Sequence, residues 1–157
     1  MLKIRFIVVD RTRSLFLKKG ETFYLERLRR YAQIEWIEVR PASMKKGRPE
    51  EEVLKTEGRA IVRRLKANDY LVALDRSGRQ LDSEELSLWM RKLSTSVRGY
   101  VCFVIGGPIG LSEEILDRAD RILSLSRLTF THEMSRLFLV EQVYRAFTIM
   151  EGQKYHK

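Results

Sequence analysis

Hydrophobic and polar positions along this chain alternate between short apolar runs and longer amphipathic stretches. The apolar runs are typical of strands buried on both faces of a parallel sheet, and they cover residues 2–9, 34–39, 70–74, 100–105 and 121–125. Apolar residues at helical spacing cover 14–31, 50–66, 82–94, 112–119 and 132–150. Because strands and helices alternate throughout, we predict an α/β fold with a mostly parallel sheet and helices on both faces.

Glycine and hydroxyl residues directly follow two of the predicted strands. Gly106, Gly107 and Gly110 come after the run that ends at Ile105, and a polar segment, 126–129, comes after the run at 121–125. Glycine lets the backbone approach a ligand closely, and ligands of open α/β sheets bind outside the carboxyl ends of the strands. The sequence therefore predicts a ligand pocket at these two strand ends.

The predicted helix at 132–150 is apolar almost all round, whereas a surface helix would show a polar face. We therefore expect it to be buried on more than one side. In a chain of 157 residues the second side is expected to pack against a partner subunit, most simply in a twofold homodimer.

Length and composition predict one domain over 1–157. The N-terminal apolar run is short and ends at Asp10, which fits a first strand and not a signal peptide, and no run approaches the roughly 18–20 residues of a membrane span. The single cysteine, Cys102, lies in a predicted buried strand, where an inert thiol is expected. A chain without an internal disulfide fits a reducing cytoplasm.

Positive charge is concentrated in the first part of the chain. Residues 1–66 hold 18 Lys and Arg against nine Asp and Glu, whereas 67–157 hold 12 of each, so the first part carries the whole net charge of +9. A polyanion-facing surface is one interpretation, with Lys45, Lys46 and Arg48 as candidate RNA-binding residues, and a solvated basic face is the other.

Several common catalytic signatures are missing. Residues 106–110, GGPIG, match neither the dinucleotide fingerprint nor the P-loop, which argues against a nucleotide hydrolase or an ordinary dinucleotide enzyme. No Cys, His and carboxylate cluster has metal-ligand spacing, so we expect no metal. The sequence leaves both a structural and a functional role open for His132, whereas the exposed polar tail around His156 favours function. Ser126 and Thr129 are expected to be turn or cap residues.

Six segments, concentrated in the C-terminal third, stand in an ordered series. They are the L-D-x-x-G of Leu74–Gly78 with Ser83-Glu84 after it, FVIGG at Phe103–Gly107, SLSRLTFTHE at Ser124–Glu133, EQVYRA at Glu141–Ala146, IMEG at Ile149–Gly152 and YHK at Tyr155–Lys157. In this order they resemble the small SPOUT-superfamily 23S rRNA pseudouridine N3-methyltransferases. Two departures stand out, namely Val9-Asp10-Arg11 where the family commonly shows V-G-K, and Thr131 where it commonly shows Pro.

The resemblance implies a homodimer with a C-terminal trefoil knot, a rare topology that no propensity argument would select. It also implies that three loops hold S-adenosylmethionine in a bent form. The implied cofactor-binding residues are Leu74, Gly106, Leu125, Ser126, Arg127, Leu128, Thr129 and Phe130. The implied substrate is a pseudouridine in a hairpin of 23S rRNA, presented by the assembled 70S ribosome.

For catalysis we expect Tyr155 and His156 to close over the target base, with the tail of one protomer completing the pocket of the other. Arg145 and Arg136 are expected to stabilise the developing negative charge or to hold phosphate, and a simple salt bridge is the alternative for either residue. Two alternatives remain at this stage. One is a knotted methyltransferase acting on another RNA such as tRNA, and the other is a non-catalytic ribosome-binding α/β protein, which would not bind S-adenosylmethionine.

Overall fold

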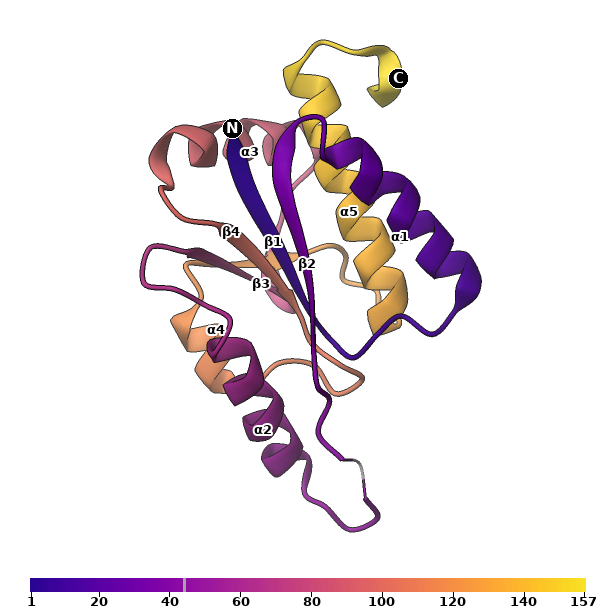
Figure 1. Cartoon of the computed structure of the whole chain (residues 1–157), viewed down its shortest axis with the longest axis vertical. Coiled ribbons are helices and arrows are strands. Elements are labelled where there is room, and N and C mark those ends of the chain that lie inside the picture. Colours follow the sequence, from indigo (N-terminus) through magenta and orange to yellow (C-terminus); the bar gives the residue numbers. More distant parts are fainter. Residues whose placement is uncertain (44) are drawn as a thin grey trace.

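The computed structural model describes residues 1–43 and 45–157, and its strands form one parallel sheet (Figure 1). The order across the sheet is β2-β1-β4-β3-β5. The strands are β1 (Leu2–Val9), β2 (Ala32–Val39), β3 (Tyr70–Gln80), β4 (Val101–Ile105) and β5 (Arg121–Ser124). All carboxyl ends therefore lie at the same edge of the sheet, as the sequence predicted.

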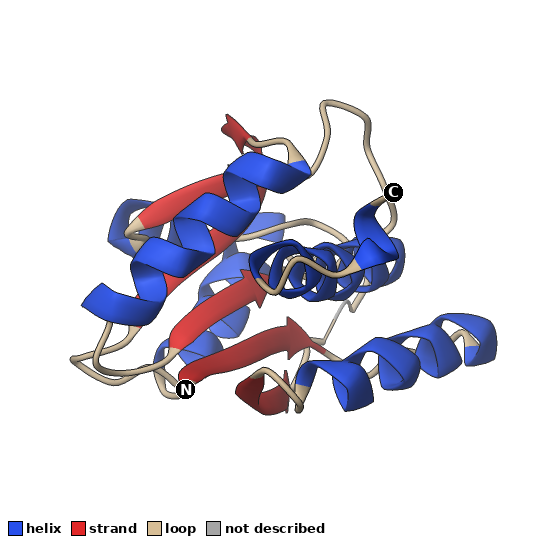
Figure 2. Cartoon of the chain, turned by 90° about the horizontal axis from the view of Figure 1, so that it is seen from above, coloured by secondary structure: helices blue, strands red, loops and turns tan. Residues whose placement is uncertain are grey.

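Helices cover both faces of this sheet, with α1, α3 and α5 on one face and α2 and α4 on the other (Figures 1 and 2). Their bounds are α1 (Leu15–Leu28), α2 (Glu50–Val62), α3 (Ser83–Ser96), α4 (Glu113–Arg118) and α5 (His132–Met150), followed by a 3-10 turn, Lys154–His156. In the described part of the chain, no helix combines the length and apolar character needed to cross a membrane. The predicted α/β architecture is confirmed.

The central strand β4 divides the apolar side chains between two cores. Phe103 packs with residues of α1, α3 and α5, whereas its neighbours Cys102 and Val104 pack with Ile61 of α2 and Ile115 of α4. All five side chains are essentially inaccessible to solvent. Burial of each large aliphatic or aromatic side chain contributes roughly 1.5–3 kcal/mol, so both faces of the sheet contribute to stability.

The thiol of Cys102 is buried, as expected. Burial is the largest cause that raises the pKa of Cys102, to about 12, and the nearby Asp69 carboxylate adds to it. A thiol that stays protonated is a poor nucleophile, which confirms the prediction of an inert buried cysteine.

Side-chain caps begin three of the helices where the sequence suggested. Asp82 accepts a hydrogen bond from the Glu85 amide, and Glu85 accepts one from the Asp82 amide, which completes the expected capping box. Ser112 caps α4 and Thr131 caps α5. A side chain that accepts from the first free amides contributes about 1 kcal/mol, which fixes the start of each helix.

The two largest departures from the predicted bounds are at the end of β3 and at the end of α2. Residues 75–78, expected to form a turn, lie inside β3, which continues to Gln80 with a register shift against β5. Gly78 permits this, because a Cβ there would lie 2.6 Å from the backbone of Ile122 on β5. Helix α2 ends at Val62 and not near Lys66. Beyond that point the amides of Arg64 and Leu65 bond to the third preceding carbonyl, as in a 3-10 turn.

The apolar helix α5 is covered largely by the chain itself. It packs between α1 and α3, which accounts for much of the second apolar side that we had assigned to a partner subunit. Some apolar side chains stay exposed next to it, including Leu15 (77%) and Phe16 (72%) on α1 and Phe138 (38%) on α5. The homodimer therefore remains a prediction that now rests on these exposed residues.

Candidate functional site

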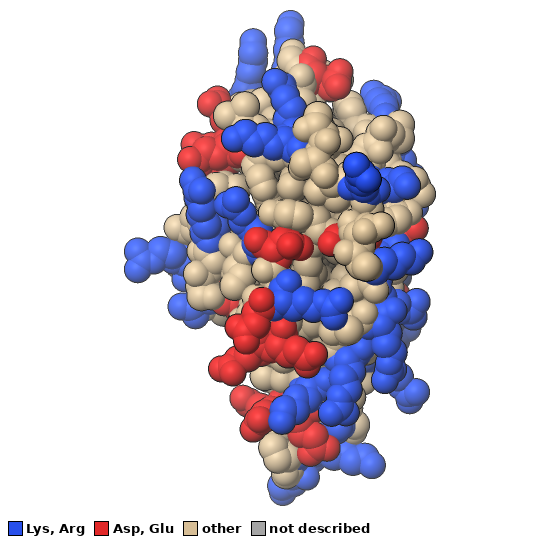
Figure 3. Space-filling model, turned by 90° about the vertical axis from the view of Figure 1, so that its left-hand side faces the viewer, with Lys and Arg blue, Asp and Glu red and all other residues tan. Residues whose placement is uncertain are grey.

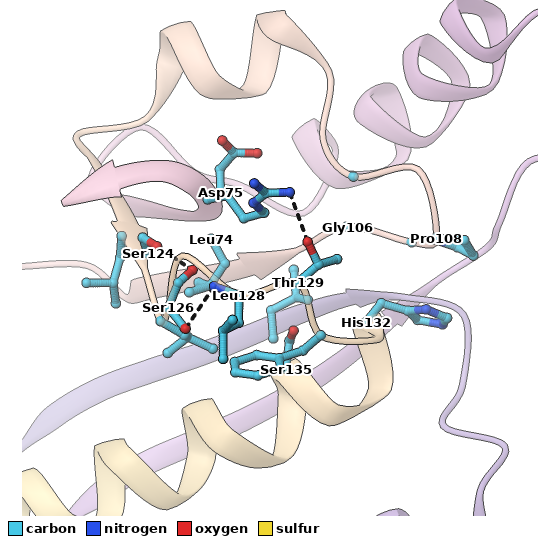
Figure 4. Close-up of a pocket in the computed structure, with 17 residues that line it drawn as sticks. Leu74, Asp75, Gly106, Pro108, Ser124, Ser126, Leu128, Thr129, His132 and Ser135 are labelled. Atoms are coloured by element: carbon cyan, nitrogen blue, oxygen red, sulfur yellow. Dashed lines mark hydrogen bonds between the residues drawn. The ribbon is translucent and has the colours of Figure 1, made fainter. Parts of the chain in front are cut away.

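A cleft of about 210 Å³ opens where the part of β3 beyond Leu74 meets the loops after β4 and β5 (Figure 4). These segments follow Leu74 in β3, Ile105 in β4 and Ser124 in β5, and the start of α5 closes one side. Residues from all of them line the cleft, among them Leu74, Gly106, Leu125, Ser126, Leu128, Thr129, Phe130 and His132. The structure thus brings together all but one of the predicted cofactor-binding residues, although their role toward a ligand stays a prediction.

The remaining residue, Arg127, lies outside this cleft. Its exposed side chain borders a neighbouring shallow depression with Arg76 and Ser77. Asp75 and Arg76, which were not among the predicted site residues, line both this depression and the main cleft. The sequence signal for these two residues was the L-D-x-x-G segment, in which they are the second and third positions and which was predicted to form a turn.

The glycine loop after β4 is a tight turn in which Gly106 is required by the chain's own backbone. A Cβ on Gly106 would lie 2.4 Å from the Gly110 carbonyl oxygen. Gly110 has φ of 86° and donates its amide to the Gly107 carbonyl at 3.0 Å. The sequence predicts that Gly106 lets a ligand approach. In the structure Gly106 lets the loop close on itself, and the closed loop forms part of the cleft wall.

Hydroxyl groups hold the segment after β5 in shape. Ser124 donates its hydroxyl to the Ser126 carbonyl at 3.0 Å, and the Ser126 hydroxyl accepts the Leu128 amide at 3.0 Å (Figure 4). Arg76 donates to the Thr129 hydroxyl at 2.9 Å, which ties the β3 and β5 segments together across the cleft. These serines are turn residues, as expected, and the pairing of Arg76 with Thr129 was not foreseen.

Leucine side chains give the cleft apolar walls. Leu74 and Leu125 are half-buried against the core, whereas Leu128 at the rim is 70% exposed. A large exposed apolar side chain at the edge of a cavity is typical of a binding site in which it contacts an apolar ligand surface such as a flat ring.

His132 connects the cleft to the first turn of α5. Its side chain lines the cleft and is labelled in Figure 4. Burial is the main cause that lowers the pKa of His132 below its usual 6.5, and the cation of Arg136 lowers it further. The imidazole is therefore mostly neutral at pH 7.

We expect the stability of the protein to fall in mild acid because of His132. The unfolded chain takes up a proton as the pH falls through about 6.5, whereas folding opposes that proton, so stability is lost from there downward. Urea unfolding between pH 7.5 and 5 should show that the wild type loses stability relative to His132→Gln. Parallel pH profiles for the two proteins would contradict the lowered pKa.

The loop after β1 borders the other side of His132. Asp10 occupies the left-handed region with φ of 69°, a conformation natural for the glycine that the resembling family commonly has there. Its carboxylate compensates by accepting the Arg11 amide at 2.9 Å and the Arg13 guanidinium at 2.9 Å. Asp10 therefore adopts a backbone conformation that favours glycine, and its side chain holds the loop.

Arg136 supports this loop from below and is fully buried. It donates to the Thr12 hydroxyl at 2.9 Å and to the Val9 carbonyl, and Glu21 accepts from Thr12 in the same group. Burial lowers the pKa of Arg136 and raises that of Glu21. Arg136 forms no salt bridge within the described residues, because a hydroxyl and a carbonyl accept from its guanidinium, and a role toward a developing negative charge stays a prediction.

The predicted catalytic tail lies far from the cleft of its own chain. Helix α5 has 19 residues and is about 28 Å long, and the chain folds back after it, so the 3-10 turn packs beside α5 near Glu141 and Tyr144 and not at His132 (Figure 1). Tyr155 bonds to Tyr24 at 3.2 Å and to Glu141 at 3.0 Å, and its ring lies against that of Tyr144. Within one chain, the structure does not bring Tyr155 and His156 to the cleft.

Arg145 belongs to this remote group as well. Its guanidinium forms a salt bridge with Glu141 and lies over the Tyr155 ring, 4.8 Å from the ring centre. His156 lies 3.9 Å from the Glu84 carboxylate. Arg145 and Tyr155 are therefore in contact, and His156 follows Tyr155 in the same 3-10 turn, while the catalytic role of all three stays a prediction.

The basic segment between β2 and α2 contains exposed lysines and an arginine that bonds within the loop. Met44 of this segment lies outside the described residues. Lys45 and Lys46 are exposed. Arg48 instead donates to Glu52 at 3.1 Å, to the Ser43 carbonyl at 3.0 Å and to Thr56 at 3.3 Å, so it organises the loop. On the face in Figure 3, Lys and Arg side chains form a band beside an acidic group, so the basic character is segregated and not uniform.

Comparison with known proteins places this architecture in a family. The family model described as "Predicted SPOUT methyltransferase" matches residues 2–156. The chain belongs to this SPOUT methyltransferase family. It is 42% identical over 159 residues to a Clostridioides difficile protein named "Ribosomal RNA large subunit methyltransferase H", covering 99% of this chain and all of the relative. A Moorella thermoacetica protein with the same name is 41% identical over 161 residues, covering both chains fully.

Solved structures of low sequence similarity support the fold alone. A probable methylase family protein from Haemophilus influenzae superposes with a TM-score of 0.59 at 16% identity, covering all of this chain and 72% of that one. A probable methyltransferase from Bordetella pertussis gives 0.53 at 18% identity, with coverages of 92% and 96%. The chain is thus a methyltransferase of the SPOUT family, with its strand-end cleft as the candidate active site.

Proposed function

We propose that this SPOUT methyltransferase transfers a methyl group from S-adenosylmethionine to N3 of a pseudouridine in a 23S rRNA hairpin, on the assembled ribosome in the cytoplasm. The observation that carries the proposal is the meeting of three strand-end segments around one cleft, in a chain about 40% identical over its full length to large-subunit rRNA methyltransferases. The knot implied by the resemblance belongs to the proposal, with these three segments as its crossings.

The residues of the cleft fit the proposed methyl donor. Leu74, Leu125 and Leu128 offer apolar surface for an adenine ring, and the tight glycine turn presents backbone groups at the floor of the cleft. Asp75 supplies a carboxylate at the β3 side, a suitable partner for ribose hydroxyl or ammonium groups. When bound, the sulfonium supplies an electrophilic methyl group.

The protein's own contribution to the reaction is chiefly orientation. Holding the target nitrogen in line with the donor converts a bimolecular step into a local one, an effect that can contribute several kcal/mol. The bond between Arg76 and Thr129 and the turn at Ser126 fix the walls against which the donor rests. Walls held in this way align the reactants without forming a covalent intermediate.

N3 of the target base carries a proton that has to leave, and the tail supplies groups for this step. In this proposal Tyr155 and His156 of one protomer reach the cleft of the other, because neither residue lines the cleft of its own chain. In this arrangement Arg145, next to Tyr155, provides positive charge near the anion that forms at the base.

A homodimer of this kind has a suitable surface available. Leu15, Phe16, Phe138 and Leu128 are exposed apolar residues at α1, α5 and the cleft rim. A soluble chain seldom leaves several such side chains uncovered near one another, which supports a self-association surface beside the cleft.

Electrostatic contact with rRNA would involve the exposed lysines of the β2–α2 loop. We expect Lys45→Glu/Lys46→Glu to weaken ribosome binding and to reduce the slope of log affinity against log salt by about 1.5, since each lost phosphate contact removes about 0.7–0.9. Filter binding to 70S particles over a salt series measures both quantities.

The matched control is Arg91→Glu/Lys92→Glu, which reverses two exposed charges on α3, on the opposite face of the sheet. Its binding and salt slope should stay close to wild type. Equal effects of the two double variants would assign the result to net charge, and no effect of the loop variant would return Lys45 and Lys46 to a solvated face.

The activity is tested by methyl transfer from labelled S-adenosylmethionine to 70S ribosomes, separated subunits and tRNA from a strain that lacks the modification. We expect label in 23S rRNA, with 70S particles as the best substrate. Label confined to tRNA would support the alternative substrate class, and preference for free subunits would overturn the assembled ribosome as the target.

A further inference from the structure

A second pocket of about 290 Å³ lies directly beside the cofactor cleft and shares Pro108 and His132 with it. Its walls come from the loops after β1, β2 and β4 and from α2. Apolar side chains, including Val9, Ala42 and Ile109, form much of its lining, together with Asp10 and Glu57. A small ring placed here would lie next to whatever occupies the cleft.

Glu57 is the unusual member of this pocket. Its side chain is on the inward face of α2, and the residue is only 5% exposed. One carboxylate oxygen, Oε2, accepts the Ala42 amide at 3.0 Å. The other, Oε1, is buried and has no hydrogen-bond partner among the described residues.

A buried oxygen without a hydrogen-bond donor costs free energy of folding. A ligand that donates a hydrogen bond to this oxygen would offset that cost. A Cβ on Gly107 would lie 3.5 Å from Oε1, which places the oxygen just under the glycine loop shared by both pockets. Burial, reinforced by the charge of Asp10, raises the pKa of Glu57, as expected for an acceptor that lacks a donor. Glu57 therefore carries an unused acceptor oxygen at the wall of the second pocket.

The proposed substrate offers a donor that an ordinary uridine lacks. In pseudouridine the ring is attached to ribose through carbon, so N1 carries a hydrogen, and uridine presents a C–H at the equivalent position. We propose that this pocket receives the target ring and that Glu57 Oε1 accepts its N1–H, so that Glu57 selects pseudouridine over uridine while N3 faces the methyl donor. The inference rests on the proposed function and adds the residue that determines base specificity.

Glu57→Gln is the sharpest variant, because a carboxylate accepts at both oxygens and an amide accepts at only one. If the amide oxygen keeps the Ala42 amide, its NH₂ group faces the ring N–H, and two donors oppose each other. The assay compares kcat/KM on ribosomes with pseudouridine and on ribosomes with uridine at the target position.

We expect the wild type to favour pseudouridine by at least about tenfold, a typical effect of one buried hydrogen bond to a charged group. Glu57→Gln should lose about that factor on pseudouridine and little on uridine, so that the preference collapses. A purely structural role would lower both activities together and leave their ratio unchanged, and an unchanged ratio would overturn the proposal. A wild type that methylates neither ribosome would instead reject the proposed function itself.

Ala42→Leu provides a second test that keeps the carboxylate and the Ala42 amide. The larger side chain fills the pocket, so we expect loss of methyl transfer to both ribosomes with calorimetric affinity for S-adenosylmethionine unchanged. Full activity of this variant would show that the target ring does not enter the pocket.

Discussion

Removal of residues 153–157 should lower methyl transfer by at least about 100-fold, because the deletion takes away the groups proposed to handle the N3 proton. None of the deleted residues lines the cleft, so the affinity for S-adenosylmethionine should stay near wild type. Single-turnover transfer to 70S ribosomes and calorimetry measure the two quantities separately.

Point variants separate chemistry from packing in the tail. Tyr155→Phe keeps the ring against Tyr144 and removes only the hydroxyl, and His156→Gln removes the ionisable group. Lys154→Gln is the control, since this exposed side chain lies in the same 3-10 turn. Wild-type turnover of the truncated protein would rule out the proposed role of the tail.

The same deletion tests whether the site forms between protomers. Mixing the truncated chain with a chain whose cleft is blocked should restore about a quarter of wild-type activity, because half of the dimers are mixed and each mixed dimer holds one complete site. Two inactive proteins that stay inactive after exchange of subunits would place the tail in cis or outside the reaction.

Replacement of Gly106 by valine should reduce the affinity for S-adenosylmethionine by more than about tenfold. A Cβ at 106 would meet the Gly110 carbonyl oxygen at 2.4 Å, so the turn has to open and the floor of the cleft changes shape. Calorimetry on the purified variant, after its thermal unfolding has been checked, measures the loss.

Gly99 offers a matched control at the opposite end of β4. A Cβ there would meet the Asn68 carbonyl oxygen at the same 2.4 Å, but the position lies ahead of the strand, away from the cleft. Gly99→Val should therefore lower stability as Gly106→Val does, and folded protein should still bind the methyl donor. Equal loss of binding in both variants would assign the effect to global unfolding.

The fold was largely predictable because local patterns and global architecture agree. The β1 bounds, the start and end of α5 and the capping box at Asp82 follow from apolar periodicity and side-chain caps. The extension of β3 through residues 75–80 was not predictable. The residues there favour a turn, but close contact of Gly78 with β5 keeps the segment extended. Contacts between segments distant in sequence decide such cases.

The candidate site was also predictable only in part. Strand-end glycines and hydroxyls predicted the cleft, because the carboxyl ends of parallel strands meet at one edge. The roles of Arg136, Arg48 and Glu57 could not be predicted, because each depends on a partner brought near by folding: the Val9 carbonyl, the Ser43 carbonyl and the Ala42 amide. A charge in a sequence does not reveal whether it faces solvent or a buried carbonyl.

The central claim is that the cleft between the three strand-end segments holds the methyl donor beside a tail from the partner protomer. A crystal structure with S-adenosylhomocysteine tests it most directly. The account predicts the adenine ring against Leu74, Leu125 and Leu128, in a knotted homodimer whose partner tail covers the open side of the cleft. A ligand bound elsewhere, or a cleft left open to solvent in a monomer, would contradict it.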